Sequence, residues 1–363
     1  MKAMSLVQRT TSLASLAHSP LPQRALTAVA MARRGSSNVC GCVVRSLSSG
    51  AASSSVATGP EHATFVREVA AMEPPASLQA LLSVLQAKGE SAVSPYSTRR
   101  GVIPLAIPLT ETAEGEMTAL LRWPTPASGM DVPVVRVKSF GVTLLAKSPE
   151  EFIHRALVEE DAAGSSGRIA ECAGEVGSGL YRRGDFEASK SSSVDVYLMK
   201  KVGLFPDVFE RLAMRHFDNG DNISALVTGE YYASKKHFPG FGRPFVFNAE
   251  LMLKVGRKLE AKDAARCALR SPWWTLGSSY ADVANIAGWG EEQIEFMRER
   301  VSEEGRREDL LKGKDLAQVA VDQAAFLLDL AAVDCTWDDV REQLANFYKE
   351  AGFDDIARFV STV

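Results

Sequence analysis

The chain has 363 residues, of which 46% are hydrophobic and 24% are charged, and its formal net charge is −4. This composition is typical of a folded globular protein and excludes a largely disordered chain. The five cysteines have neither zinc-ligand spacing nor the density of a disulfide framework, and no apolar run approaches the length of a transmembrane helix.

The first 60 residues have the composition of a targeting segment. They contain six basic residues, many serines and threonines, and no aspartate or glutamate. We therefore predict a transit peptide over residues 1–60, with a disordered basic tail as the other interpretation. The serine run at 53–55 favours a chloroplast, in the stroma or peripheral to the thylakoid. Residues 45–49 are similar to a mitochondrial processing site and leave the mitochondrial matrix as the alternative.

Loss of this segment changes the charge of the protein. Six of the 41 basic residues go with it, so 35 remain against 45 acidic residues, and the net charge becomes −10. Phosphate backbones repel such a protein unless it carries a local basic face. We expect no DNA partner, and the charge also counts against RNA.

A small α+β module is predicted over residues 61–165. Residues 62–88 predict two short helices separated by two prolines. Four short apolar or β-branched segments bounded by turn formers then predict an antiparallel sheet, and they cover 102–107, 117–123, 132–137 and 141–145. Three prolines in or beside them cannot donate ladder hydrogen bonds, so we expect at least two edge strands. Such an edge is either an interaction site or is guarded by proline and charge.

The rest of the chain is predicted to be helical. Ser148 and Pro149, followed by two glutamates, have the pattern of a helix start. After a Gly-Ser linker at 164–167, the apolar residues recur with helical spacing, which predicts a helical-repeat domain over residues 166–363. The fold class is therefore mainly α, with a helical-hairpin array preceded by the small sheet module.

A repeated Ala-Gly-Ala skeleton marks the predicted helical hairpins. Glycine follows the first alanine by seven residues and precedes the second by five in three triplets: Ala213, Gly220 and Ala225; Ala249, Gly256 and Ala261; Ala345, Gly352 and Ala357. Glycine tolerates the left-handed backbone needed just past a helix end. Successive turn glycines are 36, 36 and 34 residues apart, and the predicted turn residues are Gly184, Gly220, Gly256, Gly290 and Gly352. This near-constant step is typical of a stacked helical array.

The pattern resembles the tetratricopeptide repeat, in which a small residue, a large residue, a glycine and a second small residue follow in order. Two units match well: Ala249, Met252, Gly256, Ala261 and Ala268; and Ala345, Tyr348, Gly352 and Ala357. Units around Gly184, Gly220 and Gly290 are degenerate, so the resemblance covers residues 168–363. Such arrays bind protein segments along the groove of their first helices, and the resemblance implies the groove residues Met214, Phe217, Arg243, Val246, Glu250, Leu253 and Lys254.

Two further segments are candidates for partner contact. Residues 237–244 interleave aromatics with glycines and prolines, and with the preceding lysines they form a concentrated basic patch: Lys235, Lys236, Phe238, Phe241 and Arg243. The other interpretation of this loop is a cap whose phenylalanines fill the hairpin core. Trp273 and Trp274 are adjacent and cannot point the same way, so we expect one of them to be partly exposed or covered by a neighbouring loop.

No catalytic, nucleotide-binding or metal-binding motif stands in a suitable context, and the histidines lack ligand spacing, so we expect no cofactor and no metal. We predict a non-catalytic scaffold, adaptor or assembly factor that binds a protein partner or a multisubunit organelle complex. Two alternatives stay open. One is an enzyme with a site between the module and the helices, using Glu159, Glu160 and His154, and the other is an organelle RNA-binding repeat protein.

Overall fold

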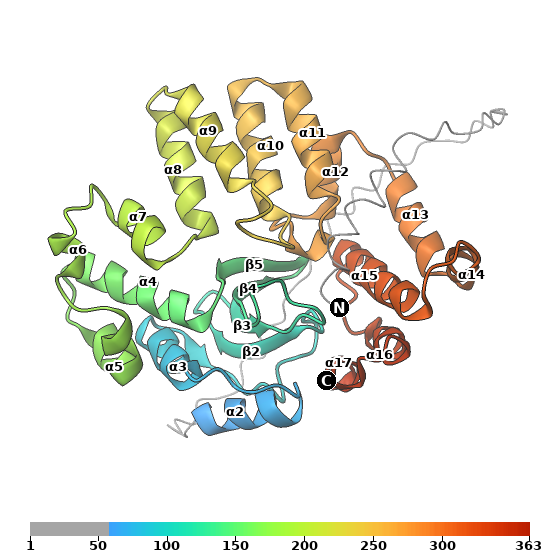
Figure 1. Ribbon diagram of the computed structural model, residues 1–363, viewed down its shortest axis with the longest axis horizontal. Helices are drawn as coiled ribbons and strands as arrows, with labels where there is room; N and C mark the ends of the chain where they lie inside the picture. Colours follow the sequence, from blue (N-terminus) through green and yellow to red (C-terminus); the bar gives the residue numbers. More distant parts are fainter. Residues whose placement is uncertain (1–57) are drawn as a thin grey trace. The chain divides into compact units, whose positions relative to one another are not determined.

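A five-stranded antiparallel sheet lies near the start of the part of the chain that the computed structural model describes, residues 58–363 (Figure 1). Its strands pair in sequence order: β1 (Ser91–Ala92), β2 (Ala106–Glu111), β3 (Met117–Leu121), β4 (Val134–Lys138) and β5 (Gly141–Ala146). The predicted antiparallel sheet is confirmed. The two-residue strand β1 was too short to predict from its sequence pattern. The predicted transit peptide lies, up to residue 57, outside the described residues.

Proline shapes strand β2 without making it an edge. Pro108 lies opposite Ala119 of β3, and the pairing register shifts between Pro108 and Thr110. Because proline has no N–H to donate, a bulge at this point costs the ladder little. The expectation that such prolines require edge strands is therefore wrong for β2, which lies between β1 and β3.

Helices precede and follow the sheet in the first 200 residues. They are α2 (Thr58–Glu68), α3 (Leu78–Ala87), α4 (Pro149–Ala162), α5 (Arg168–Leu180), α6 (Asp185–Ala188), α7 (Val194–Tyr197) and the π-helix η1 (Leu198–Val202). The start of α4 is as predicted, since the Ser148 hydroxyl accepts a hydrogen bond from the Glu151 N–H and Pro149 occupies the first turn. Ser77 makes no cap for α3; its hydroxyl instead donates to Glu150 and ties α3 to α4.

The remaining chain is helical, which confirms the predicted fold class. Its helices are α8 (Pro206–Asp218), α9 (Asn222–Tyr232), α10 (Arg243–Val255), α11 (Lys258–Ala268), the 3-10 turn η2 (Trp273–Thr275), α12 (Tyr280–Ala287), α13 (Glu292–Val301), α14 (Glu303–Leu311), α15 (Leu316–Asp334), α16 (Arg341–Glu350) and α17 (Asp354–Ser361). Helices α8 to α12 each contact the next one along the chain (Figure 1).

Four of the five predicted turn glycines have a left-handed backbone. Gly256 ends α10 with φ of 88°, and Gly220 and Gly352 have φ of 79° and 78° between helices of a pair. Gly184 has φ of 92° but precedes α6 rather than ending a long helix. Gly290 has no positive φ, because α12 already ends two residues earlier at Gly288, with φ of 63°.

Replacing Gly256 by alanine is expected to cost about 1 kcal/mol of unfolding free energy, because a Cβ disfavours this backbone conformation. No neighbouring atom lies within 4 Å of the new Cβ, so the cost is conformational alone. The matched control is Gly179→Ala inside α5, where the surroundings are equally open and the φ is not left-handed. There alanine should stabilise by about 0.5–1 kcal/mol. Thermal melting of both variants checks the opposite signs, and shifts of the same sign would contradict the helix stop.

The turn between β4 and β5 joins segments that are far apart in the sequence. The indole N–H of Trp337, just before α16, donates to the Ser139 carbonyl at 2.8 Å. Gly141 lies against the backbone of Trp274 in η2, and the Trp274 ring packs on that of Trp123 with centroids 5.1 Å apart. The turn is therefore held by both the middle and the final part of the chain.

Helix α15 is long and apolar enough to qualify as a membrane span by length and composition alone. From the sequence we expected no apolar run of this length. The run was overlooked because Asp322 and Asp329 interrupt its apolar residues. Half of the most apolar stretch of α15 is buried inside the protein, and the helix contacts α13, α14, α16 and η2. The Asp329 carboxylate accepts a hydrogen bond from the backbone N–H of Trp273 at 2.7 Å, so this face of α15 is tied to the protein interior.

Candidate functional site

A cleft of about 510 Å³ lies between the sheet, α4, α8 and the start of α10. Its floor is polar. Arg136 of β4 and Thr143 of β5 are directly opposite each other, and both line it. Glu90, which precedes β1, accepts hydrogen bonds from Arg136 at 3.0 Å and from Thr118 at 2.6 Å. The sheet thus presents a fixed ion pair to the cleft.

Helices supply mixed apolar and charged walls. Their lining residues are Phe152, Arg155, Ala156 and Glu159 from α4; Pro206, Asp207 and Glu210 from α8; and Phe238, Phe241, Arg243 and Pro244 from the loop before α10 and its first turn. The positions follow from helix geometry: Arg155 and Glu159 are four residues apart and Asp207 and Glu210 are three apart, so each pair lies on one helix face. Sequence neighbours on each helix therefore reach the same wall.

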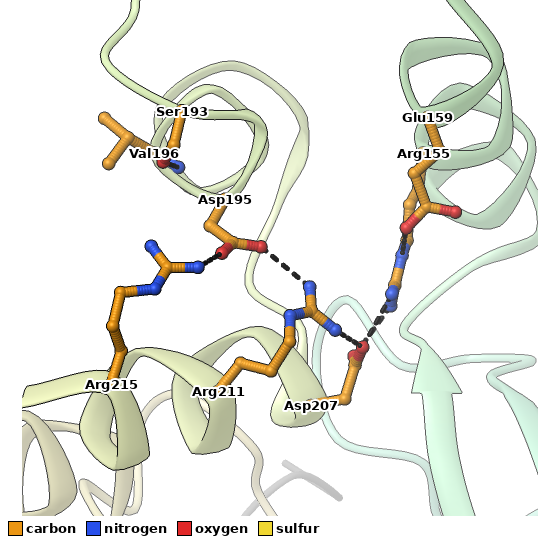
Figure 2. Close-up of polar contacts among 8 residues, drawn as sticks. All are labelled: Arg155, Glu159, Ser193, Asp195, Val196, Asp207, Arg211 and Arg215. Carbon is orange, nitrogen blue, oxygen red and sulfur yellow. Dashed lines mark hydrogen bonds and ion pairs between the residues drawn. The ribbon is translucent and has the colours of Figure 1, made fainter. Parts of the chain in front are cut away.

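Arg155 links α4 to α8 through a two-pronged ion pair (Figure 2). Its two terminal nitrogens donate to the two Asp207 carboxylate oxygens at 2.7 and 2.6 Å, and its Nε donates to Glu159 at 2.7 Å. Bidentate guanidinium–carboxylate pairs are among the strongest hydrogen-bonded contacts in proteins. The pair fixes the relative position of the two helices at the cleft.

The network continues from Asp207 to α7 (Figure 2). Arg211 donates to Asp207 at 2.8 Å and to Asp195 at 2.7 Å, and Arg215 donates to Asp195 at 2.9 Å. Asp195 is buried in α7, whose first turn is capped by the Ser193 hydroxyl accepting from the Val196 N–H. Burial raises the pKa of Asp207, but its hydrogen bonds and charge interactions with Arg155 and Arg211 outweigh this and hold the pKa below its ordinary value of 3.8.

A second arginine centre links α8 to the start of α10. Arg243 donates to both Glu210 oxygens at 2.9 Å and to Glu250 at 3.2 Å. The Tyr232 hydroxyl also donates to Glu210, at 3.0 Å. Burial, followed by the charge of Glu210, raises the pKa of Tyr232 well above 10.0. This phenol is a hydrogen-bond donor at every pH that the protein meets.

The charged side chains that line the cleft are all paired. Four basic and four acidic side chains line it, and each forms an ion pair: Lys88, Arg136, Arg155 and Arg243 with Glu90, Glu159, Asp207 and Glu210. A general base near neutral pH needs a carboxylate whose pKa is raised. Asp207 is shifted the other way.

The residues proposed for an enzyme do not converge. Glu160 accepts hydrogen bonds from the Ile169 and Ala170 N–H groups at 2.8 and 3.0 Å, so it caps the start of α5. The His154 ring lies 5.9 Å from that of Tyr181, and burial lowers its pKa below 6.5. Of the three, Glu159 alone lines the cleft, paired with Arg155.

The predicted partner-binding residues separate into three groups. Phe238, Phe241 and Arg243 line the cleft, but both phenylalanines are only 3% exposed, which is the capping arrangement. Val246, Trp273 and Trp274 are buried, so neither tryptophan is partly exposed. The indole N–H of Trp273 is satisfied internally by the Leu269 carbonyl.

The third group lies nearer the surface. Lys235, Lys236, Leu253 and Lys254 are exposed, whereas Met214, Phe217 and Glu250 are partly buried. Most of the charged residues that line the cleft were not predicted from the sequence: Lys88, Glu90, Arg136, Arg155, Asp207 and Glu210. The usable signal was the four-residue spacing of Arg155 and Glu159 and of Asp207, Arg211 and Arg215, which marks charged helix faces.

Asp207→Asn should weaken the junction of α4 and α8. We expect a loss of about 1–2 kcal/mol at pH 7, since Arg155 loses a charged partner while the half-exposed site lets water compensate. A carboxylate with a lowered folded-state pKa stabilises above its unfolded pKa. The difference between wild type and variant should therefore be constant from pH 6 to 8 and shrink as the pH falls below about 4. Urea denaturation across this range measures it, and a difference that grows towards acid pH would contradict the assignment.

Comparison with known proteins assigns nearly all of the described residues. Three family models match in succession: PAB N-terminal over residues 60–201, PAB middle domain over 206–290 and PAB C-terminal domain over 294–363. The chain belongs to the PAB family. A relative from Arabidopsis thaliana, called "Protein IN CHLOROPLAST ATPASE BIOGENESIS, chloroplastic", is 56% identical over 299 residues, which cover 82% of this chain and 90% of the relative. No solved structure matches the chain.

Membership of the PAB family agrees with the organelle targeting read from the sequence, and the chloroplast is the location of the protein. The family boundaries group α2 to α7 with the sheet, α8 to α12 as a middle part, and α13 to α17 as the last part. The cleft and the Arg155–Asp207 pair therefore lie where the N-terminal and middle PAB regions meet.

Proposed function

We propose that this protein is a non-catalytic assembly factor for the chloroplast ATPase and that it binds a polypeptide of that complex. The observation that carries the proposal is the 56% identity, over most of both chains, to a relative named for chloroplast ATPase biogenesis. Similarity of this extent makes a shared role the simplest interpretation.

The geometry supports a binding role. The cleft carries paired charges between apolar walls, and the enzyme residues point to different elements. We also propose that helices α8 to α11 serve as a tetratricopeptide-like pair of hairpins, with contacts between α8 and α9, α9 and α10, and α10 and α11. On this pair the exposed candidates Lys235, Lys236, Leu253 and Lys254 are available to a partner.

Loss of the protein from chloroplasts tests the role. We expect the assembled ATPase to fall several-fold on native gels, with the photosystems of the same membranes as the internal control. Expression of the wild-type protein should restore it, and so should His154→Gln, because the proposed role needs no acid–base group and His154 does not line the cleft. Unchanged ATPase content would overturn the proposal. Failure of a folded His154→Gln variant would favour the enzyme.

A further inference from the structure

Helix α9 carries an apolar row on its outer face. Ile223, Val227 and Tyr231 follow one another at four-residue spacing and are 78%, 61% and 56% exposed. Residues at this spacing lie on one side of a helix. The opposite side of the same helix, with Ala225, Gly229 and Tyr232, is buried. Helix α9 is thus apolar on both sides, although only one side is covered.

The row is held rigidly. Helix α9 contacts α8 on one side and α10 on the other, and a Cβ at Gly229 would lie 2.9 Å from atoms of Asn248 and Leu251. The Tyr231 ring rests 4.3 Å from that of His237, whose Nδ1 is 2.8 Å from the Tyr231 carbonyl oxygen. A surface ordered in advance loses little entropy when it binds a partner.

Charges of opposite sign lie at the two ends of the row. Lys235 and Lys236 follow Tyr231 closely and are exposed, and neither forms an ion pair with another described residue. At the other end, Asp218 and Asp221 precede Ile223 and are also exposed. A partner segment that lies along the row therefore meets a basic end and an acidic end.

The middle PAB region is also the basic part of an acidic protein. Residues 206–290 contain 11 lysines and arginines against 9 aspartates and glutamates. The corresponding numbers are 15 and 18 for residues 60–201, and 9 and 16 for residues 294–363. An acidic segment approaching the protein is repelled least by the middle region.

We propose that the α9 row, defined as Ile223, Val227 and Tyr231, docks an amphipathic helix of the client polypeptide. The client helix carries apolar residues at the same spacing, acidic residues at the end that meets Lys235 and Lys236, and a basic residue at the other end. This names the partner chemistry for the proposed assembly role and rests on it. Three side chains are far short of the ~800 Å² per partner that a stable homodimer buries, so a releasable client fits better than a second copy.

Peptide binding to the full-length mature protein tests the inference. The probes are three labelled synthetic helical peptides of equal length, read by fluorescence anisotropy. The first has an apolar row with glutamates at one end and lysines at the other. The second has the same row with lysines at both ends, and the third has the charges of the first with a polar row. We expect the first peptide to bind in the micromolar range and the other two at least tenfold more weakly.

Variants then locate the site. Val227→Asp should weaken binding of the first peptide at least tenfold, and Lys235→Glu with Lys236→Glu should weaken it several-fold while improving binding of the lysine peptide. The matched control is Leu311→Asp on α14, another apolar residue, 82% exposed, whose change should have no effect. Circular dichroism verifies that each variant folds. If Val227→Asp does not fold, the variant with Lys235→Glu and Lys236→Glu still tests the site.

Four results with the purified protein would overturn the inference: no binding of the first peptide, equal binding of all three, equal weakening by Leu311→Asp, or a wild-type dimer in light scattering that Val227→Asp dissociates. The last would make a second copy the occupant. The chloroplast assay separates this inference from the proposed function. If the Val227→Asp protein restored the ATPase fully, the docking proposal would be wrong and the proposed assembly role would still stand.

Discussion

Gly141→Val is expected to unfold this protein or to lower its unfolding free energy by about 3 kcal/mol or more. A Cβ at Gly141 would lie 2.6 Å from the Cα and the carbonyl carbon of Trp274, and closer still to its oxygen. Backbone atoms cannot swing aside as a side-chain end can, so β5 and η2 would have to separate. The φ of 146° adds conformational strain for any residue with a Cβ. Soluble yield and urea denaturation provide the measurement.

Gly115→Val provides the comparison within the same sheet. Gly115 also has a positive φ, of 78°, but the nearest atom to its added Cβ is 3.6 Å away, at the end of the Glu111 side chain. This variant should lose only the conformational part, about 1–2 kcal/mol. Equal losses for the two variants would mean that the contact between Gly141 and Trp274 is not tight.

The consequence of Gly141→Val reaches beyond one strand, because the β4–β5 turn meets both the middle and the last PAB regions. Trp337 holds the turn from one side through the Ser139 carbonyl, and Trp274 holds it from the other. Since β5 also forms part of the cleft floor, a displaced turn would disturb Thr143 and Leu145. Loss of stability and loss of the cleft should therefore occur together.

The sequence predicted the elements that depend on local signals. The capped start of α4, the antiparallel strands and the glycine stop after α10 all follow from propensity and turn chemistry, which act within a few residues. The cleft was not predictable in this way. Arg155 and Asp207 are 52 residues apart, and their pairing depends on how α4 packs beside α8. The burial of Trp274 likewise depends on segments far away in the sequence, since it packs against Gly141 and Trp123. Its sequence neighbour Trp273 does not determine it.

Arg341→Met should be the most damaging change in the last PAB region, with an expected loss of about 3–5 kcal/mol. Arg341 is 4% exposed, and its terminal nitrogens donate to the carbonyls of Arg99, Val102 and Val360 at 2.6, 2.9 and 3.1 Å. Methionine fills a similar volume but leaves these buried oxygens without the donor. Each such oxygen costs about 1–3 kcal/mol if water cannot reach it.

A second buried arginine, Arg99, binds the same end of the chain. Arg99 donates to the Phe359 and Thr362 carbonyls at 2.8 and 2.6 Å, and its guanidinium lies 4.2 Å from the centre of the Phe359 ring. Burial, helped by the charge of Arg341, lowers the pKa of Arg99 to about 9. The two cations are held together by carbonyl oxygens at the end of α17, where the helix dipole is negative. Both are therefore needed to fasten the end of the chain to the segment before β2.

Arg358→Met is the matched control for Arg341→Met, because Arg358 lies on α17, the helix that Arg341 fastens, and each arginine pairs with an aspartate three residues before it, Asp338 for Arg341 and Asp355 for Arg358. Its side chain is 71% exposed and pairs with Asp355 three residues away. Exposed pairs of this kind contribute about 0–1 kcal/mol, so the variant should melt close to wild type. Arg341→Met should instead melt lower by roughly 6 °C or more, at about 2–4 °C per kcal/mol. Limited proteolysis should also cleave the residues after α16 sooner in Arg341→Met than in the wild-type protein. If Arg341→Met and Arg358→Met melted alike, Arg99 and Arg341 would not hold α17 in place. The C-terminal helix would then depend on its apolar face alone.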